Sequence, residues 1–561
     1  MPNERDDVNP TARSAPAEDA DAARSTVFHN GRVWSADTAE AHTLVVSAGR
    51  IVAVGGEDVR AAAVRDAEVV DLAGGMLLPG FIDAHVHPVQ GGLERRACDL
   101  SECASADECL QTIAAYAASQ PDGPWILGGG WQLAHFAEGA PRAEVLDTVL
   151  PDRPAFLSNR DHHGAWVNSR TLELAGITQS TPDPADGRIE RDASGRPTGT
   201  LHEGAMHLLD PLLPEPTVEE QLAALLEAQT YLHSVGITGW QDAIIGAYAN
   251  MGDTSAAYLS ACAEQRLTAR VVGALWWDRA RGAEQIPELV ERRMHLSGER
   301  FRATSVKIMQ DGIAENFTAG MSTPYLDACG HSTGNRGLSF VDPEALVEHV
   351  VALDALSFGI HVHAIGDRAV REALDAFEAA RERNGVTGNR HHIAHIQVIH
   401  PDDVARFAAL DITANMQPLW AAHEPQMDEL TIPFLGPERA QWQYPFAGLL
   451  RSGARLAGGS DWPVSSPDPL HGIHVAVNRV APGEDEPPFL PDQRLTLQAA
   501  LRAYTAGSAY VNGDDEAGRI TVGARADLTV LDRDLFASPI EEIATARVVQ
   551  TYVGGRLVHR A

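Results

Sequence analysis

Two histidines one residue apart could bind a metal ion at the end of an apolar run. They are His85 and His87 in the stretch GFIDAHVHPVQGG. Successive side chains of a strand point to opposite faces, so Asp83, His85 and His87 share one face of a predicted strand. Neutral imidazole is a preferred ligand of zinc. Taken alone, the pair is better explained as two hydrogen-bonded core histidines, and a metal site requires further ligands from later in the chain.

Later apolar runs end in side chains of the same chemical kinds. The candidates on their polar faces are Lys307, His361, His363, His391, His395 and Asp461. The same alternation turns His392 outward. If the apolar faces pack on surrounding helices, the polar faces collect several imidazoles, one amine and one carboxylate around one axis.

Eight short apolar runs, several of them followed by Ala-, Leu- and Glu-rich helical stretches, predict a (β/α)8 barrel. In that fold the C-terminal ends of the strands carry the chemistry. The runs are GFIDAHVH, VGITGWQDA, RVVGALWW, ATSVKIMQDG, GIHVHAIGD, RHHIAHIQ, DITANMQP and ARLAGGSD.

The spacing of these runs predicts four parts of the chain. The first strand ends near His87 and the second begins near Val235, too far apart for one crossover helix, so an inserted subdomain over the barrel mouth is expected. Both chain ends are strand-rich and predict one composite β-domain. The parts are a disordered acidic tail (1–24), the β-domain (25–78 and 510–561), the barrel (79–94 and 226–509) and the insertion (95–225).

Composition excludes several classes of partner. The formal net charge of −33 disfavours nucleic acid and anionic membranes. No apolar run approaches the roughly 18 to 20 residues needed to cross a bilayer. Five cysteines without a CxxC pair, and a polar N-terminus without a signal-peptide centre, favour a cytoplasmic protein. A homodimer is the general expectation for oligomeric state.

Lys307 is the unexpected member of the polar set, because a buried ammonium beside a divalent metal is costly. Three interpretations remain open: an ion pair with a carboxylate such as Asp311, a neutral catalytic amine, or addition of CO2 to the nitrogen. The last would create an anionic carbamate that bridges two metals, and it is favoured here.

The whole pattern resembles the amidohydrolase superfamily, in particular the amidohydrolase family 3 branch, which includes formamide deformylases. The resemblance covers nearly all of the chain after residue 24. The similar segments are VFHNGRVWSAD, LLPGFIDAHVHP, VNSRTLELAGI, PTGTLHEGAM, HAIGDRAV, AGGSDWPVSSPDPL, ALRAYTAGSAY and GRITVGARADLTVLDRD.

The resemblance implies a β-sandwich beside the barrel and one or two divalent metals, often zinc. The implied ligands are His85, His87, Lys307 as an N6-carboxylated lysine, His363, His395 and Asp461. His361 and His391 are reserve candidates. Ala394 stands where relatives often have an acidic residue before the sixth-strand histidine.

The implied reaction is hydrolysis of a non-peptide C–N bond in a linear amide such as an N-substituted formamide. Asp461 would orient the attacking water and take its proton. His163, in RDHHGAWVN, is the candidate donor to the oxyanion. Carbamate, urea or lactone hydrolysis is an alternative, and a mononuclear-metal deaminase is a weaker one.

Aromatic residues predicted near the pocket favour a small uncharged substrate with an apolar or aromatic group. Those assigned to substrate binding, with His163, are Trp131, Phe317 and Trp420. Trp462 is a further neighbour of Asp461.

Overall fold

The computed structural model describes residues 25–36, 41–63, 66–121, 123–136, 139–248 and 251–561. The predicted tail, 1–24, lies outside the described residues. In the described part of the chain, no helix combines the length and apolar character needed to cross a membrane.

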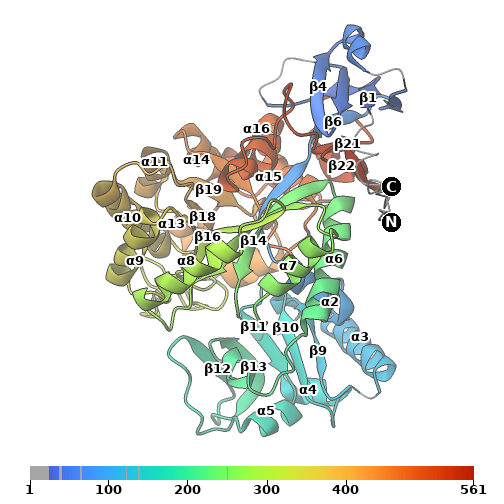
Figure 1. Cartoon of the computed structure of the whole chain (residues 1–561). Helices are drawn as coiled ribbons and strands as arrows, with labels where there is room; N and C mark the ends of the chain where they lie inside the picture. The colour runs from blue at the N-terminus through green and yellow to red at the C-terminus, as the bar shows by residue number, and fades with distance from the viewer. Residues whose placement is uncertain (1–24, 37–40, 64–65, 122, 137–138, 249–250) are drawn as a thin grey trace, which may run out of the picture.

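An eight-stranded parallel sheet forms the centre of the molecule, and its strands follow chain order around a nearly closed barrel (Figure 1). Each strand coincides with one of the eight predicted runs, so the predicted barrel is confirmed. The strands are β7 (Phe81–Val86), β14 (Ile237–Ile245), β15 (Arg270–Trp276), β16 (Phe301–Met309), β17 (Gly359–Ala364), β18 (His392–His395), β19 (Thr413–Met416) and β20 (Leu456–Gly458).

Hydrogen bonds join the last two barrel strands to the first. The backbone amide of Asp461, just after β20, donates to the His85 carbonyl at 2.8 Å, which places the end of β20 beside the end of β7. The side-chain nitrogen of Asn415, on β19, donates to the Ala84 carbonyl of β7 at 2.9 Å. The outward residues Val306 and Ile308 of β16 lie in the core shared with the surrounding helices.

Helices follow the barrel strands and also flank the inserted segment. They are α2 (Pro88–Arg96), α3 (Ala106–Ser119), α4 (Ala143–Asp147), α5 (Ser169–Ala175), α6 (Val218–Ser234), α7 (Ser255–Ala263), α8 (Ile286–His295), α9 (Pro343–Ala355), α10 (Asp367–Asn384), α11 (Pro401–Leu410), α12 (Ile432–Leu435), α13 (Pro437–Ala440), α14 (Phe446–Arg451), α15 (Pro469–Asn478), α16 (Leu497–Arg502) and α17 (Ser508–Val511).

Strands from both chain ends build two further sheets at one end of the molecule (Figure 1). Phe28 and Leu44 of one sheet pack with Leu77, Val530 and Tyr552 of the other in a separate apolar core, which is the predicted sandwich. One sheet contains β4 (Arg50–Gly55), β3 (Thr43–Ser47), β1 (Ser25–His29) and β5 (Glu68–Asp71); the other contains β2 (Arg32–Val33), β6 (Met76–Pro79), β21 (Leu528–Leu531), β22 (Val548–Val553) and β23 (Arg556–Arg560).

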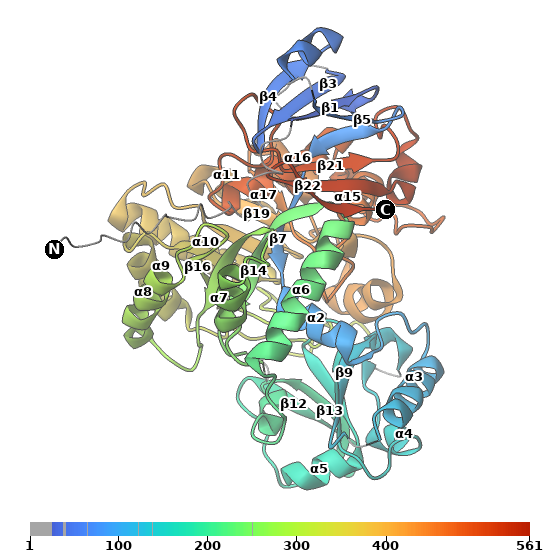
Figure 2. The ribbon, with the colours of Figure 1, turned by 45° about the vertical axis from the view of Figure 1, so that its right-hand side comes forward.

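The inserted segment, which lies between β7 and β14 in the sequence, forms a six-stranded sheet. This sheet lies at the opposite end of the barrel from the sandwich (Figure 2). Helix α6 leads from it into β14 and begins with a reciprocal capping box between Thr217 and Glu220. The strands, in sheet order, are β12 (Gly187–Arg191), β13 (Pro197–Glu203), β11 (Gly164–Val167), β10 (Ala155–Asn159), β9 (Ile126–Trp131) and β8 (Cys98–Asp99).

Candidate metal centre

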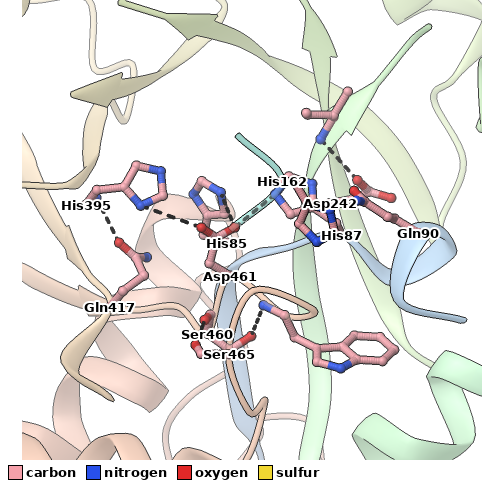
Figure 3. A network of polar contacts seen from close by, with 12 residues as sticks. His85, His87, Gln90, His162, Asp242, His395, Gln417, Ser460, Asp461 and Ser465 are labelled. Atoms are coloured by element: carbon pink, nitrogen blue, oxygen red, sulfur yellow. Dashed lines mark hydrogen bonds and ion pairs between the residues drawn. The ribbon is translucent and has the colours of Figure 1, made fainter. Parts of the chain in front are cut away.

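Two histidines and one carboxylate converge where the first and last barrel strands meet. His85 Nε2 lies 3.1 Å from Asp461 Oδ1, and His87 Nε2 lies 2.9 Å from the same oxygen (Figure 3). His85 belongs to β7, whereas His87 is the N-cap residue of α2. Burial raises the pKa of Asp461, but the neighbouring His85 and His87 outweigh burial and hold that pKa well below its usual range. Asp461 therefore carries a negative charge among these imidazoles at neutral pH.

His395 completes this group from the end of β18. Its Nδ1 atom is buried without a hydrogen-bond partner in the described part of the protein and lies 3.8 Å from Asp461 Oδ2. The ring stacks on Trp420 at a centroid distance of 5.4 Å and an interplanar angle of 9°. The stacking fixes the plane of the ring, so Nδ1 stays directed at the Asp461 carboxylate.

His85, His87, His395 and Asp461 line a cavity of about 70 Å³. His363 of β17 and Lys307 of β16 line this cavity too. The His363 ring lies 4.4 Å from that of His395, between centroids. Lys307 is 3% exposed and is the single lysine of the sequence. Burial lowers the pKa of its amine to about 7, against the attraction of Asp461. Of the residues described, none forms a hydrogen bond or ion pair with this amine.

Asp311 is not the partner of Lys307. Its carboxylate accepts hydrogen bonds from the backbone amides of Gly320, Ile365 and Gly366 at 2.8 to 3.0 Å. The ion pair considered from the sequence is therefore absent from the described structure, and Lys307 remains an unpaired amine that faces the ligand histidines.

The donor set fits a divalent metal. Two acceptor atoms, a neutral imidazole nitrogen and a carboxylate oxygen, repel each other at the 3.1 Å that separates His85 Nε2 from Asp461 Oδ1, unless a proton or a cation lies between them. The unsatisfied Nδ1 of His395 points to the same place. Nitrogen and carboxylate ligands in this mixture are typical of zinc and similar metals.

The insertion contributes a histidine–carboxylate pair to this cavity. His163 Nδ1 lies 3.0 Å from both oxygens of Glu203, and Thr318 Oγ1 donates to Glu203 Oε1 at 2.8 Å. Burial favours neutral imidazole, but the Glu203 carboxylate outweighs it and raises the pKa of His163 to about 9. The His163 ring lies 5.8 Å from that of His363. His163 is therefore protonated at neutral pH beside the predicted metal ligands, which leaves Nε2–H as a donor in addition to the Nδ1–H held by Glu203.

His162, the neighbour of His163 in sequence, lines the same cavity. Gln90 of α2 contacts His162 Nδ1 at 2.8 Å and donates to Glu94 at 3.1 Å. Burial lowers the pKa of His162 to about 3, so its ring is neutral.

Two predictions about the faces of β18 are wrong. His392 points into the barrel, where its Nε2 contacts Gln241 Oε1 at 3.0 Å. His391 points outward, stacks on Phe377 of α10 and contacts Asp354 at 3.0 Å. The alternation fails because His395 adopts a φ of +75°, which turns its side chain back toward the axis.

Of the three predicted aromatic residues, Trp420 lines the cavity. Trp131 is fully buried in the core of the insertion, where its indole donates to the Leu157 carbonyl at 2.8 Å. Phe317 packs edge-on against Tyr325 and Phe434 outside this cavity. The structure therefore does not bring Trp131 and Phe317 to the metal ligands.

A second chamber of about 80 Å³ adjoins the first. Ile313, Ile365 and Trp420 line both, so the two chambers are neighbours that share part of their walls. Glu315 and Glu424 also line the second chamber; burial raises the pKa of both carboxyl groups, that of Glu315 to about 7.

Sequence reasoning missed residues that hold the histidines next to the predicted ligands. Glu203 contacts His163, Gln241 contacts His361, and Asn415 contacts His392. The segment PTGTLHEGAM, which contains Glu203, was noted as family-like, and that was the available signal.

The sequence and the structure were compared with those of known proteins. A family model described as amidohydrolase family matches residues 68–559. The chain is 31% identical over 545 residues to N-substituted formamide deformylase of Arthrobacter pascens, covering 94% of this chain and 96% of the relative. It is 32% identical over 546 residues to the protein LONG AFTER FAR-RED 3 of Arabidopsis thaliana, covering 94% and 91%. An uncharacterized metal-dependent hydrolase from Pyrococcus furiosus has a similar structure, with a TM-score of 0.67, 28% identity, and coverage of 91% and 99%.

Proposed function

The chain belongs to the amidohydrolase family, and on that premise we propose that it is a metal-dependent hydrolase of a linear amide. The bond cleaved is a non-peptide C–N bond, as in an N-substituted formamide. One observation carries the proposal: His85, His87 and His395 all direct a ring nitrogen at the Asp461 carboxylate.

The residues that would hold one or two divalent ions, zinc being the first candidate, are His85, His87, Lys307, His363, His395 and Asp461. A metal bound there supplies a Lewis acid for the carbonyl oxygen and lowers the pKa of water toward neutrality.

Asp461 and His163 divide the proton chemistry. Asp461 is ionised, so it can accept a proton from the attacking water and release it to the leaving amine. His163 faces the cavity as an imidazolium held by Glu203, so its proton can bond to the oxygen that becomes negative in the tetrahedral transition state. The two residues approach the cavity from different parts of the chain, the barrel and the insertion.

Lys307 is proposed to act as a carbamate. Its amine has a pKa of about 7, so a large part is unprotonated at neutral pH and can attack CO2. The nitrogen lone pair forms the new N–C bond while one C=O π pair of CO2 moves onto oxygen, the nitrogen gives up a proton to water, and the product is an anionic oxygen ligand. This conversion removes the cost of an unpaired amine in a 3% exposed position beside metal ligands.

The chambers favour a substrate with an uncharged, apolar or aromatic substituent. Ile313, Ile365 and Trp420 are apolar side chains that line both chambers. A substituent on the amide could therefore extend from the metal centre past Trp420 into the second chamber.

The decisive experiment combines metal analysis with a substrate panel. Purified protein should contain one or two divalent ions per chain and hydrolyse an N-formyl or N-acyl amine. Asp461→Asn should lower kcat by roughly 10²- to 10⁴-fold, the usual range for a lost acid–base group. Full activity after exhaustive chelation, or turnover confined to carbamates, ureas, lactones or aminopurines, would reject the proposal.

A further inference from the structure

A network of buried polar side chains connects the predicted ligand His85 to the interior of the barrel. Each of its members is at most 5% exposed. They are His85, Gln241, His361, His392, Asn415 and Asn512. Hydrogen positions in such a network follow from the partners, because each group can only donate or only accept at a given atom.

The network has an unambiguous starting point at a backbone carbonyl. The Asn415 side-chain nitrogen donates to the Ala84 carbonyl at 2.9 Å, which fixes it as the NH2 end of the amide. Its second hydrogen points to His392 Nδ1 at 3.1 Å. His392 Nδ1 must therefore accept, and the hydrogen of the neutral His392 ring lies on Nε2.

An independent contact confirms the orientation of Asn415. The backbone amide of His395 donates to Gln417 Oε1 at 2.8 Å, so the other end of that amide is its NH2 group. This group donates to Asn415 Oδ1 at 3.3 Å. Both ends of Asn415 are thus assigned from backbone groups.

Gln241 transmits this assignment across the barrel. His392 Nε2 donates to Gln241 Oε1 at 3.0 Å, and the Gln241 nitrogen donates to Asn512 Oδ1 at 3.1 Å. The same Oε1 lies 2.7 Å from His361 Nδ1. A carbonyl oxygen only accepts, so His361 carries its hydrogen on Nδ1.

His361 in turn determines the state of His85. The His361 ring is fully buried, and in the described part of the chain its nitrogens meet only Gln241 and His85 and no carboxylate, so a charge on it would be uncompensated. The ring is therefore neutral, and with its hydrogen on Nδ1 its Nε2 is a bare acceptor. That atom lies 2.9 Å from His85 Nδ1, which must therefore donate. The remaining nitrogen of His85, Nε2, is left with its lone pair toward Asp461.

We propose that Gln241 and His361 are positioning residues that hold His85 in the Nδ1–H tautomer and present the Nε2 lone pair to a metal. The proposal rests on the metal site of the proposed function. In the opposite tautomer, Nε2–H would donate to Asp461 at 3.1 Å and a metal would first have to displace that proton. The network thus favours the Nδ1–H tautomer of His85, which can bind a metal at once, over the Nε2–H tautomer, which hydrogen-bonds to Asp461 in the absence of metal.

The test removes Gln241 Oε1, the acceptor that fixes the hydrogen of His361 on Nδ1 and, through His361, the hydrogen of His85 on Nδ1. Gln241→Met keeps a similar volume but frees His361 to reverse its tautomer. Mutation of such outer residues typically weakens metal binding 10- to 100-fold. We expect that loss in zinc affinity, measured by chelator competition, and a change of His85 from Nδ1–H to Nε2–H in the metal-free protein.

Tautomers are read from ¹⁵N-histidine solid-state spectra, with His85 assigned by the signals lost in His85→Gln. The matched control is Gln229→Met. Gln229 is also a buried glutamine whose oxygen accepts two amide hydrogen bonds, from Thr268 at 2.8 Å and Ala269 at 3.2 Å, but it lies on α6 away from the metal ligands. Its variant should match Gln241→Met in lost stability and retain wild-type zinc affinity.

The wild-type spectrum decides the proposal even if Gln241→Met does not fold. An Nε2–H signal for His85 in the metal-free wild type overturns it, as does a Gln241→Met variant with unchanged tautomer and affinity. A wild type with the expected Nδ1–H signal that binds no zinc supports the tautomer assignment and instead rejects the proposed function.

Discussion

A carbamate on Lys307 can be detected without interference from other lysine side chains. The chain contains no other lysine, so a carbamate signal has no background from other ε-amines. In metal-loaded protein supplied with ¹³C-bicarbonate, we expect one protein-bound carbamate resonance in the ¹³C spectrum. Lys307→Arg should lose both the resonance and most of the activity, because guanidinium stays protonated.

An active wild type without that resonance would contradict the carbamate and leave Lys307 as a neutral amine. Partial rescue of Lys307→Ala by a short-chain carboxylate would support an anionic role for this position.

The pair of His163 and Glu203 predicts a pH dependence. Glu203 raises the pKa of His163 to about 9, so the imidazolium is present below pH 9 and is lost above it. Activity that depends on this proton should fall as pH rises through about 9. Glu203→Gln removes the negative charge, which lets burial lower the pKa of His163, so the alkaline limb of kcat/KM should move to lower pH.

A conservative control is Thr318→Val, which removes a hydrogen bond to Glu203 but leaves the charge. It should move the alkaline limb much less than Glu203→Gln does. An unchanged limb in both variants would exclude His163 as the group that titrates there.

At the scale of elements, helix α2 packs tightly between helix α6 on one side and Trp462 on the other. A methyl group on Gly92 would lie 2.1 Å from the Ala224 carbonyl oxygen of α6, and one on Gly91 would lie 2.5 Å from the Trp462 ring. Because His87 caps α2, a shift of this helix also shifts a predicted ligand.

Gly92→Ala should therefore lower both stability and zinc affinity. Overpacking of this kind costs about 1–3 kcal/mol, and displacement of His87 should weaken zinc binding in addition. The matched control is Gly448→Ala in α14, where the added methyl meets neighbours at 3.6 Å or more. Thermal unfolding and chelator competition report the two effects; a Gly92→Ala protein as stable and as tight-binding as Gly448→Ala would contradict the coupling.

The strands were predictable because each barrel strand is a short apolar run that ends in polar or small residues. The faces of β18 were not, because only four residues form this strand and the left-handed backbone at His395 reverses the parity that alternation assumes. Glu203 was equally hidden, since its role depends on His163, which lies 40 residues earlier and meets it only through the folded insertion sheet.

At the scale of the whole molecule, negative charge predominates both in the chain as a whole and in the lining of the second chamber. The chain has a formal net charge of −33, and the second chamber is lined by the carboxyl groups of Asp161, Glu315 and Glu424 against the single guanidinium of Arg160. A carboxylate on the substrate would enter this chamber against an excess of like charge, in surroundings where burial weakens screening by salt.

Matched substrates should reveal this excess charge. Among N-formylbenzylamines, a para-carboxylate should have a kcat/KM at least about tenfold below that of the neutral para-carboxamide, equivalent to about 1.4 kcal/mol. Burial raises the pKa of Glu315 to about 7, so this group loses its charge as pH falls below 7. The difference between the two substrates should therefore narrow from pH 8 to pH 6, and Glu315→Gln should narrow it at pH 8 alone. Equal turnover of both substrates at pH 8 would show that the substituent does not enter the second chamber.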